Sequence, residues 1–241
     1  MATLAERETA LRLEMATNFE RYAGACLRIK AKSGVTGPLL LNRSQRYLHR
    51  RLEAQRKSKG KVRALVLKGR QVGISTYIAA RFYWRVTHKL GFRCYVIAHT
   101  DDASNNLFNL VRRFHDNCPV MFRPETGAAN AKELAFPKLD SGYKVGTAGS
   151  QELGRADTIQ LCQGSEMSFW PNADKHAAGL QQAIADLPDT EDIRESTANG
   201  IGNAFHSLWK AAERGKSGFE AIFIPWYWHE EYEECCIVVV N

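Results

Sequence analysis

One segment, residues 64–76, constrains the fold of this chain more than any other. It reads ALVLKGRQVGIST: an apolar run ends in Lys68-Gly69, and a helical pattern begins at Ser75. A strand, a glycine-bearing turn and a helix that starts with Ser or Thr are the construction of a phosphate-binding loop. The glycines let successive N–H groups point inward, and the helix adds its positive N-terminal end. We therefore predict a phosphate site, in which Ser75 or Thr76 places a hydroxyl on magnesium.

The loop departs from the pattern G-x-x-x-x-G-K-S/T at two positions. Gly73 and Ser75 fit, but Ile74 stands in the lysine position and Lys68 in the first glycine position. A loop that neutralises a triphosphate still needs a cation, so we predict that Lys68 enters from the upstream end and that Arg70 offers a second, forked donor. The alternative for this stretch alone is a strand–turn–helix whose glycines merely make a tight turn.

Composition sets broad limits. The chain has 241 residues, of which 44% are apolar and 24% charged, and these values suit one substantial domain with a small helical extension. No apolar run approaches the roughly 20 residues that span a bilayer. The net charge of +7 permits a phosphate-rich partner such as DNA without establishing one. The six cysteines form no C-x-x-C and the histidines no H-x-x-x-H. We therefore expect reduced thiols in a cytoplasmic compartment and no structural zinc.

The first part of the chain is predicted to be helical. Apolar residues recur at helical spacing from about Leu4 to Lys32, and a second helix, which Ser44 can cap, ends near Lys57. Gln45 lies in the first turn of that second helix, where its amide can both donate to and accept from a base edge. It is therefore a candidate adenine reader, with an ordinary helix-start glutamine as the alternative.

Residues 77–117 alternate helix, strand and helix, which implies a parallel sheet with helices on both faces. Ligands of such sheets bind beyond the carboxyl ends of the strands. A hairpin is expected around Asp140-Ser141-Gly142, followed by a small polar loop over 146–154. Arg155 ends this loop, where it can reach phosphates of its own site or of a neighbour's, or can simply be solvated.

Two later strands bring further candidates. The strand 158–163 leads into Ser165-Glu166, and hydrolysis of a nucleoside triphosphate needs an acid at such a strand end to orient water and a neighbour to hold magnesium. Glu166 fits the first role, whereas Ser165 occupies the usual Asp place and can hold magnesium only weakly or through water. The strand 192–197 runs into the polar turn at Asn199-Gly200, which can sense a terminal phosphate. A helix over 204–215 and a strand over 219–224 follow.

These motifs together resemble the ATPase domain of the large terminase subunit, the DNA-packaging motor of tailed phages, over about residues 40–232. The ordered set is Ser44-Gln45, Lys68-Gly69-Arg70-Gln71-x-Gly73-x-Ser75-Thr76, Gly154-Arg155, Ser165-Glu166-x-x-Phe169-Trp170, Ser196-Thr197-Ala198-Asn199-Gly200 and Ile224-Pro225-Trp226. The resemblance implies an α/β P-loop NTPase of the ASCE or RecA-like type, with a mostly parallel central sheet flanked by helices. It also implies a helical extension over 1–38, an ATPase domain over 39–232 and a tail or linker start over 233–241.

The resemblance assigns roles to individual residues, with ATP and Mg²⁺ as cofactors. It implies that Glu166 activates water and that Arg155 completes a neighbouring subunit's site. Thr197 and Asn199 couple hydrolysis to movement, and Ser75, Ser165 and Glu166 are the expected metal-site residues. The expected ATP-binding residues are Gln45, Lys68, Gly69, Arg70, Gln71, Val72, Gly73, Ile74, Ser75 and Thr76. Ile74 and Ser165 depart from the family pattern and leave the magnesium site short of one carboxylate, so slow hydrolysis by the isolated chain is expected.

The implied partners are double-stranded DNA, the portal protein, the small terminase subunit and further copies of the chain in a ring on the procapsid. The chain alone could be a monomer in solution. We expect it in the host cytoplasm, transiently on the procapsid, without a membrane partner and without the nuclease activity that large terminases usually add. The alternatives are another P-loop DNA translocase or helicase, and a catalytically silent nucleotide- or DNA-binding module.

Overall fold

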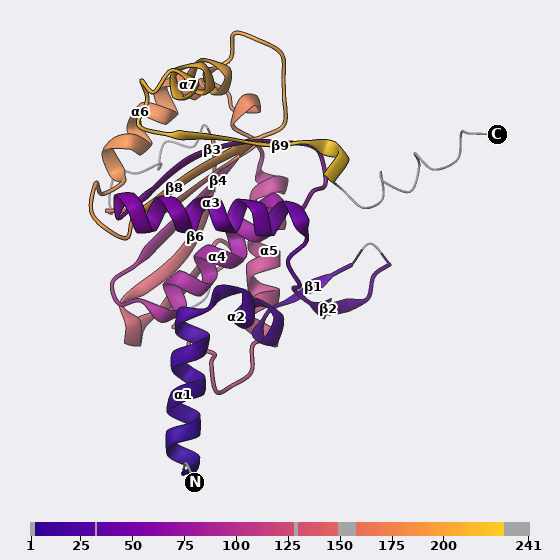
Figure 1. The fold of residues 1–241 in the computed structure, drawn as a ribbon, viewed down its shortest axis with the longest axis vertical. Helices are drawn as coiled ribbons and strands as arrows, with labels where there is room; N and C mark the ends of the chain where they lie inside the picture. Colours follow the sequence, from indigo (N-terminus) through magenta and orange to yellow (C-terminus); the bar gives the residue numbers. More distant parts are fainter. Residues whose placement is uncertain (1–2, 32, 128–129, 149–157, 229–241) are drawn as a thin grey trace, which may run out of the picture.

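A seven-stranded sheet lies at the centre of the computed structural model, which describes residues 3–31, 33–127, 130–148 and 158–228 (Figure 1). The strand order is β5-β6-β4-β7-β8-β3-β9, and every neighbouring pair is parallel except β5 and β6. The strands are β3 (Val62–Lys68), β4 (Arg93–Ala98), β5 (Glu133–Phe136), β6 (Ser141–Thr147), β7 (Leu161–Ser165), β8 (Glu191–Ser196) and β9 (Glu220–Ile224). The predicted mostly parallel α/β sheet is confirmed, and β8 lies between the phosphate-loop strand β3 and the acid-ending strand β7.

Helices cover both faces of the sheet, as predicted (Figure 1). One face carries α3 (Arg43–Lys59), α4 (Ile74–His88) and α5 (Asp101–Asn117), and the other carries α6 (Ala173–Ala183) and α7 (Ala204–Glu213). Side chains of β3 alternate between the faces: Val66 belongs to the larger core under α3–α5, and Leu65 to the smaller core under α6 and α7. In the described part of the chain, no helix is long and apolar enough to cross a membrane.

The prediction of one helix from Leu4 to Lys32 is wrong. The segment is divided into α1 (Leu4–Thr17), α2 (Phe19–Cys26) and β1 (Arg28–Lys30), and β1 pairs with β2 (Thr36–Pro38) in an antiparallel ribbon. The break occurs because Asn18 adopts an extended conformation and its side chain caps α2 by accepting from the Arg21 N–H. Met15, whose carbonyl accepts from Trp84 Nε1, and Phe19 belong to the same core as α4, so the extension packs directly on the sheet domain.

Several other boundaries also differ from the sequence analysis. The cap of α3 is Asn42 rather than Ser44, because the Asn42 side chain accepts from the Gln45 N–H and the Gln45 side chain accepts from the Asn42 N–H. The hairpin is confirmed, but β6 continues to Thr147, into the expected loop. The strand expected over 158–163 is displaced to 161–165, and α6 was not predicted at all.

The cysteines within the described residues are buried free thiols, as expected: Cys26, Cys94, Cys118 and Cys162. The predicted tail over 233–241, with the remaining cysteine pair, lies outside the described residues. The short 3-10 helices are η1 (Pro137–Leu139), η2 (Met167–Phe169) and η3 (Trp226–Trp228), and η2 and η3 follow the carboxyl ends of β7 and β9. The carboxyl edge of the sheet therefore meets the phosphate loop, η2 and η3, and this edge holds the candidate site.

Candidate functional site

The segment between β3 and α4 is a tight loop at which glycine is required twice. Gly73 has a φ of +76° and begins α4, and a Cβ added there would lie 2.7 Å from Gln45 Nε2. A Cβ added at Gly69 would lie 2.6 Å from the Cα atom of Trp226, which is backbone and cannot move aside easily. The predicted strand, glycine-bearing turn and helix are therefore present, and the loop is held from both sides by neighbouring segments.

Lys68 points from the end of β3 into a pair of acids. Its side chain is only 8% exposed, and its Nζ atom lies 2.6 Å from Glu166 Oε1 and 3.1 Å from Glu195 Oε2. Burial lowers the pKa of Lys68, but the attraction of the two carboxylates outweighs it, so that the pKa is raised above the usual lysine value. The side chain is therefore a permanent cation at the upstream end of the loop, where the sequence predicted one.

Glu166 follows β7 in a left-handed backbone conformation, with a φ of 52°. Such a conformation is uncommon for a residue other than glycine and is found disproportionately at functional sites. Its Oε2 atom accepts from the Thr197 N–H and the Thr197 hydroxyl, both at 3.0 Å. Burial raises the pKa of Glu166, but Lys68 and the Thr197 hydrogen bonds lower it by more, so the net shift is downward. Glu166 is therefore a carboxylate at neutral pH.

Glu195, on β8, is a member of this site that the sequence analysis missed. Its side chain is fully buried, and its Oε1 atom accepts from the Ser75 hydroxyl at 2.7 Å and the Ser165 hydroxyl at 2.8 Å. The available signal was the alternation of Glu191, Ile193 and Glu195, which places two acids on one face of a central strand. Acids are rarely buried without a partner or a function, so this pattern pointed to a site.

A cavity of about 350 Å³ opens beside these groups, and its size is within the range of small-ligand sites. It is lined by Lys68, Arg70, Gln71, His99, Glu166, Phe169 and Thr197. The structure thus brings together five of the predicted site residues around one cavity, at the carboxyl ends of the strands. His99 also lines the cavity, and its buried Nδ1 atom has no hydrogen-bond partner among the described residues.

Other predicted residues support the loop from outside this cavity. Gln45 is 4% exposed, and its Nε2 atom donates to the Gly73 carbonyl at 2.8 Å, so it ties α3 to the loop. Its role as an adenine reader stays a prediction. Val72 and Ile74 are buried under the loop, and the Thr76 side chain is half-buried on α4.

Asn199 donates from Nδ2 to the Ser168 carbonyl at 3.0 Å and so connects the end of β8 to η2. Arg155 lies outside the described residues.

Oxygen donors of this site fit magnesium. Within 3–31, 33–127, 130–148 and 158–228, no group of three or more His, Cys, Asp or Glu side chains could hold a metal ion by itself. Magnesium does not need such a cage, because it is usually bound by one or two carboxylates together with substrate phosphates and water. The Glu195 carboxylate and the Ser75 hydroxyl are donors of this kind, and the buried Glu195 Oε2 atom accepts no hydrogen bond from the described residues.

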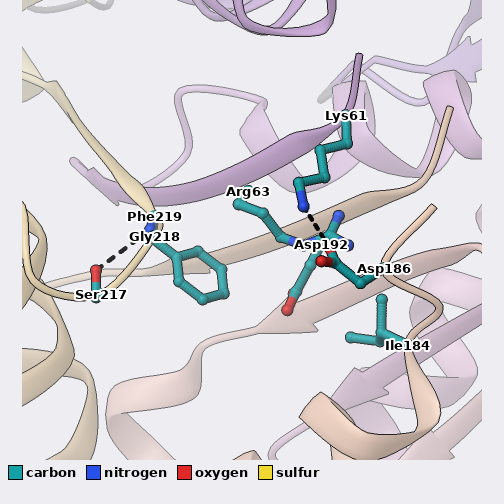
Figure 2. Close-up of a pocket in the computed structure, with 8 residues that line it drawn as sticks. All are labelled: Lys61, Arg63, Ile184, Asp186, Asp192, Ser217, Gly218 and Phe219. Atoms are coloured by element: carbon teal, nitrogen blue, oxygen red, sulfur yellow. Dashed lines mark hydrogen bonds and ion pairs between the residues drawn. The ribbon is translucent and has the colours of Figure 1, made fainter. Parts of the chain in front are cut away.

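A second cavity, of about 360 Å³, lies at the opposite, amino-terminal edge of the sheet (Figure 2). Its charged side chains contact one another: Lys61 and Arg63 both pair with Asp186, and Arg63 also donates to Thr190 Oγ1 at 3.0 Å. Asp192 pairs with Arg194 at 2.8 Å. Two cations thus share one acid in this cavity, whereas one cation serves two acids in the Lys68 cavity.

The fold has counterparts among known structures, although no protein-family model matches the sequence. The large terminase of bacteriophage HK97 is 15% identical, with a TM-score of 0.66 over 86% of this chain and 44% of that one. The large terminase ATPase domain of Thermus phage P74-26 is 17% identical, with a TM-score of 0.57 over 73% of this chain and 80% of that domain.

A large terminase from a thermophilic bacteriophage, solved in complex with ADP, is 12% identical, with a TM-score of 0.58 over 81% of this chain and 49% of that one. The chain thus spans less than half the length of this protein and of the HK97 terminase. The predicted resemblance is confirmed at the level of the fold, which is similar to that of phage large terminase ATPase domains.

Proposed function

We propose that this chain is the ATP-hydrolysing motor domain of a viral large terminase, which drives double-stranded DNA into a procapsid. The observation that carries the proposal is the meeting of Lys68 and Glu166 at one cavity beside a phosphate-type loop. A loop that only made a turn would not need a buried cation at its upstream end, paired with an acid that follows another strand in a left-handed conformation. The terminase-like fold supports the same function.

Lys68 has the central electrostatic role in this proposal. Its ammonium group lies between Glu166 and Glu195, so it is held in position before substrate arrives. When a triphosphate occupies the loop, Lys68 turns to the phosphate oxygens, because the triphosphate carries more negative charge than the two carboxylates together. The N–H groups of the loop and the first turn of α4 stabilise the same charge.

Glu166 then acts on water. Released from Lys68, its carboxylate is free to accept a proton from the attacking water and to orient it in line with the terminal phosphate. Thr197 keeps the carboxylate in place through its two hydrogen bonds. Magnesium, when bound, neutralises the charge that develops on the phosphates. The Ser75 hydroxyl and one of the two carboxylates that contact Lys68 would hold it.

Coupling to movement is assigned to the end of β8. Thr197 contacts the acid that acts on water, and Asn199 contacts the Ser168 carbonyl in η2. A change in the hydrogen bonds of Glu166 during hydrolysis therefore reaches the end of β8 through Thr197, and the same segment reaches η2 through Asn199. This short connection is the reason to retain Thr197 and Asn199 as coupling residues.

The remaining parts of the proposal rest on the sequence. Arg155 acts as an arginine finger on a neighbouring subunit, in a ring of copies that assembles with the portal and the small terminase subunit in the host cytoplasm. Lys and Arg contacts to phosphates make DNA binding tolerant of sequence and sensitive to salt.

The test is ATP turnover measured against protein concentration for the parent and three variants. Glu166→Gln is expected to lower kcat by about 10²–10⁴, as for loss of a general base, and Lys68→Ala by about 10²–10³. Arg155→Ala is expected to lower kcat by about 10³–10⁵ at concentrations where the parent activity rises faster than linearly. Lys61→Ala is the matched control, because Lys61 pairs with an acid beyond the opposite end of β3.

Three outcomes would contradict parts of the proposal. Activity that is linear in concentration and indifferent to Arg155→Ala removes the arginine finger. Turnover that Glu166→Gln leaves unchanged favours a catalytically silent module. Movement along free DNA without a portal or procapsid favours another P-loop translocase or a helicase.

A further inference from the structure

The buried carboxylate that contacts the phosphate loop comes, in this chain, from β8 and not from the strand that leads into Glu166. In P-loop NTPases, magnesium is held by the Ser or Thr of the phosphate loop and by an Asp at the end of a neighbouring strand. Here the strand that ends in Glu166 has Ser165 in that place. The structure puts a different carboxylate beside Ser165, because Glu195 of β8 is its register partner across the parallel pair.

Glu195 has the contacts that such an acid requires. Its Oε1 atom accepts from Ser75, the hydroxyl residue of the phosphate loop, at 2.7 Å, and from Ser165 at 2.8 Å. Its Oε2 atom is buried, accepts no hydrogen bond from the part of the chain that the structure describes, and lies 3.1 Å from Lys68 Nζ. One carboxylate thus contacts both positions that usually flank the metal.

The charge balance of the cluster also favours a bound cation. Lys68 contributes one positive charge, and Glu166 and Glu195 contribute one negative charge each, so the three side chains together carry a net negative charge. A fully buried carboxylate is costly unless it is paired or coordinates a metal. If Lys68 turns to the substrate phosphates, Glu195 loses its only cation among the described residues and needs another.

We propose that Glu195 supplies the carboxylate of the magnesium site, together with the Ser75 hydroxyl, in place of the acid that Ser165 has replaced. Ser165 acts as a positioning residue, whose hydroxyl aims the Glu195 side chain at Ser75. A glutamate suits this role because its side chain is one methylene longer than that of aspartate and starts from the adjacent strand. The inference rests on the proposed function, because the nucleotide phosphates complete the ion's ligands.

The alternative is that Glu195 only holds Lys68. In that case it is equivalent to Glu166, the other acid on the same lysine, and substitution of either should have the same effect on nucleotide binding. Glu166→Gln is therefore the matched comparison for Glu195→Gln, since both remove one acid from Lys68 with almost no change in shape. The sequence motif assigns Glu166 to the metal site, and this inference gives the metal carboxylate to Glu195 instead.

The experiment is equilibrium binding of a fluorescent non-hydrolysable ATP analogue, titrated once with Mg²⁺ and once with EDTA. We expect Mg²⁺ to tighten binding by the parent and by Glu166→Gln. Glu195→Gln should lose about 10- to 100-fold of that gain while its affinity in EDTA stays close to the parent's. The double variant Ser165→Asp/Glu195→Gln, which returns the acid to β7, should recover most of the gain. Ser165→Ala should lose only part of it.

Each of the other outcomes overturns a distinct claim. A Glu195→Gln protein that keeps the full Mg²⁺ gain, or loses it only as far as Glu166→Gln does, overturns the assignment of Glu195. A parent protein that binds the analogue in neither condition overturns the proposed function and this inference with it. Circular dichroism of each variant establishes that it is folded, and the recovery by the double variant excludes a general loss of structure.

Discussion

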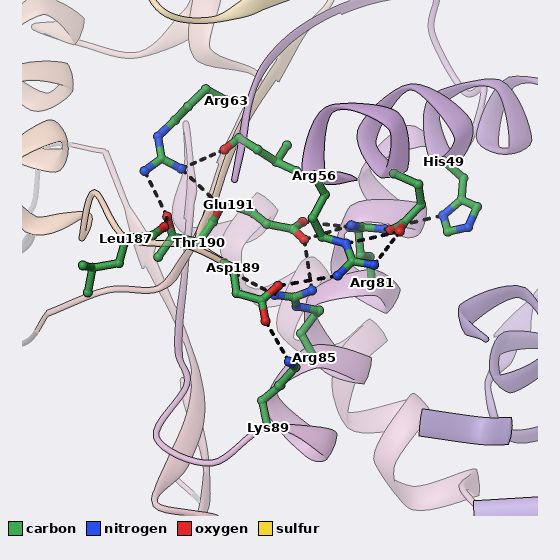
Figure 3. Close-up of polar contacts among 12 residues, drawn as sticks. His49, Arg56, Arg63, Arg81, Arg85, Lys89, Leu187, Asp189, Thr190 and Glu191 are labelled. Atoms are coloured by element: carbon green, nitrogen blue, oxygen red, sulfur yellow. Dashed lines mark hydrogen bonds and ion pairs between the residues drawn. The ribbon is translucent and has the colours of Figure 1, made fainter. Parts of the chain in front are cut away.

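Two clusters of buried charge lie at the two ends of the same strand–helix pair, β8 and α4. At one end, Glu195 meets Ser75 in the first turn of α4. At the other end, Glu191 meets Arg81 and Arg85, which lie further along the same helix (Figure 3). The two acids are four residues apart and face the same side of the sheet, so strand geometry and burial are matched.

The clusters differ in how their acids are partnered. Glu191 is fully buried, and Arg81 donates to both of its oxygens, at 2.7 and 2.8 Å (Figure 3). Glu53 pairs with Arg81 at 2.7 Å, and Asp189 pairs with Arg85 at 3.1 Å, so cations and acids are interleaved. Glu195 instead shares one lysine with a second acid, so that two carboxylates face a single cation. The first cluster is closed and holds the fold together, whereas the second is incomplete and beside a cavity.

The largest expected effect comes from the closed cluster. Glu191→Gln should lower the free energy of unfolding by about 3–5 kcal/mol, because it leaves Arg81 buried without its main partner. Glu195→Gln, the same change at the other end of β8, should alter the free energy of unfolding by less than about 1 kcal/mol, since Lys68 retains Glu166. Urea unfolding at neutral pH measures both. Equal losses would remove the distinction between the two clusters.

Glycine substitutions test whether the phosphate loop needs the close contacts that neighbouring segments make at Gly69 and Gly73. Gly69→Ala and Gly73→Ala should each cost about 1–3 kcal/mol of unfolding free energy and weaken nucleotide binding, because their Cβ atoms would lie 2.6 Å and 2.7 Å from neighbouring atoms. Gly60→Ala is the control: its φ is +72°, but nothing lies within 4 Å of the added Cβ. It should cost about 1 kcal/mol and leave nucleotide binding unchanged. Loop variants that bind like Gly60→Ala would show that the close contacts do not shape the site.

Strong acid should weaken the closed cluster. Burial raises the pKa of Glu53 and of Asp189, but Arg81 outweighs burial at Glu53, and Lys89 and Arg85 outweigh it at Asp189, which brings each pKa down to about 2. The pKa in the folded state is below that in the unfolded chain, so this stability is present above about pH 4 and is lost as the pH falls toward 2.

Glu53→Gln should therefore flatten the decrease in unfolding free energy between about pH 5 and 2, by about 1 kcal/mol after allowance for its partial exposure. Thermal or urea unfolding across this range measures the slope. A slope identical to that of the parent would contradict the assigned pairing.

The smallest effect is expected at the surface. Lys61→Ala removes an exposed pair with Asp186 and should leave the unfolding free energy within the error of the measurement. Glu213→Gln, which removes an exposed contact with Lys210 on α7, should be equally mild. Larger losses at these positions would mean that the surface pairs, and not the buried cluster at Glu191, carry the electrostatic stability.

Local patterns explain which parts of the fold could be predicted. The turn from Lys68 to Gly73 and the alternation of strands and helices depend on neighbouring residues, and both were predicted correctly. The break at Asn18 was missed because apolar residues on both sides keep helical spacing, and one capping side chain decides the boundary. The helix α6 was missed because no motif or strand pattern was recognised in residues 171–190.

The site shows the same limit. Lys68 and Glu166 were predicted from motifs, and the structure places them in contact. Glu195 could not be inferred from motif spacing, because it reaches the site through its register with Ser165 on another strand. Sequence spacing describes neighbours along the chain, whereas the missing carboxylate is a neighbour across the sheet.

The central claim is that a triphosphate binds in the loop between β3 and α4 and takes Lys68 from its acids. A crystal structure with a non-hydrolysable ATP analogue and Mn²⁺, whose anomalous signal locates the ion, tests it directly. The account predicts phosphate density on the backbone of the loop, Lys68 Nζ turned from Glu166 to a phosphate oxygen, and the ion beside Ser75 and Glu195. A nucleotide bound elsewhere, with the Lys68–Glu166 pair intact at 2.6 Å, would contradict it.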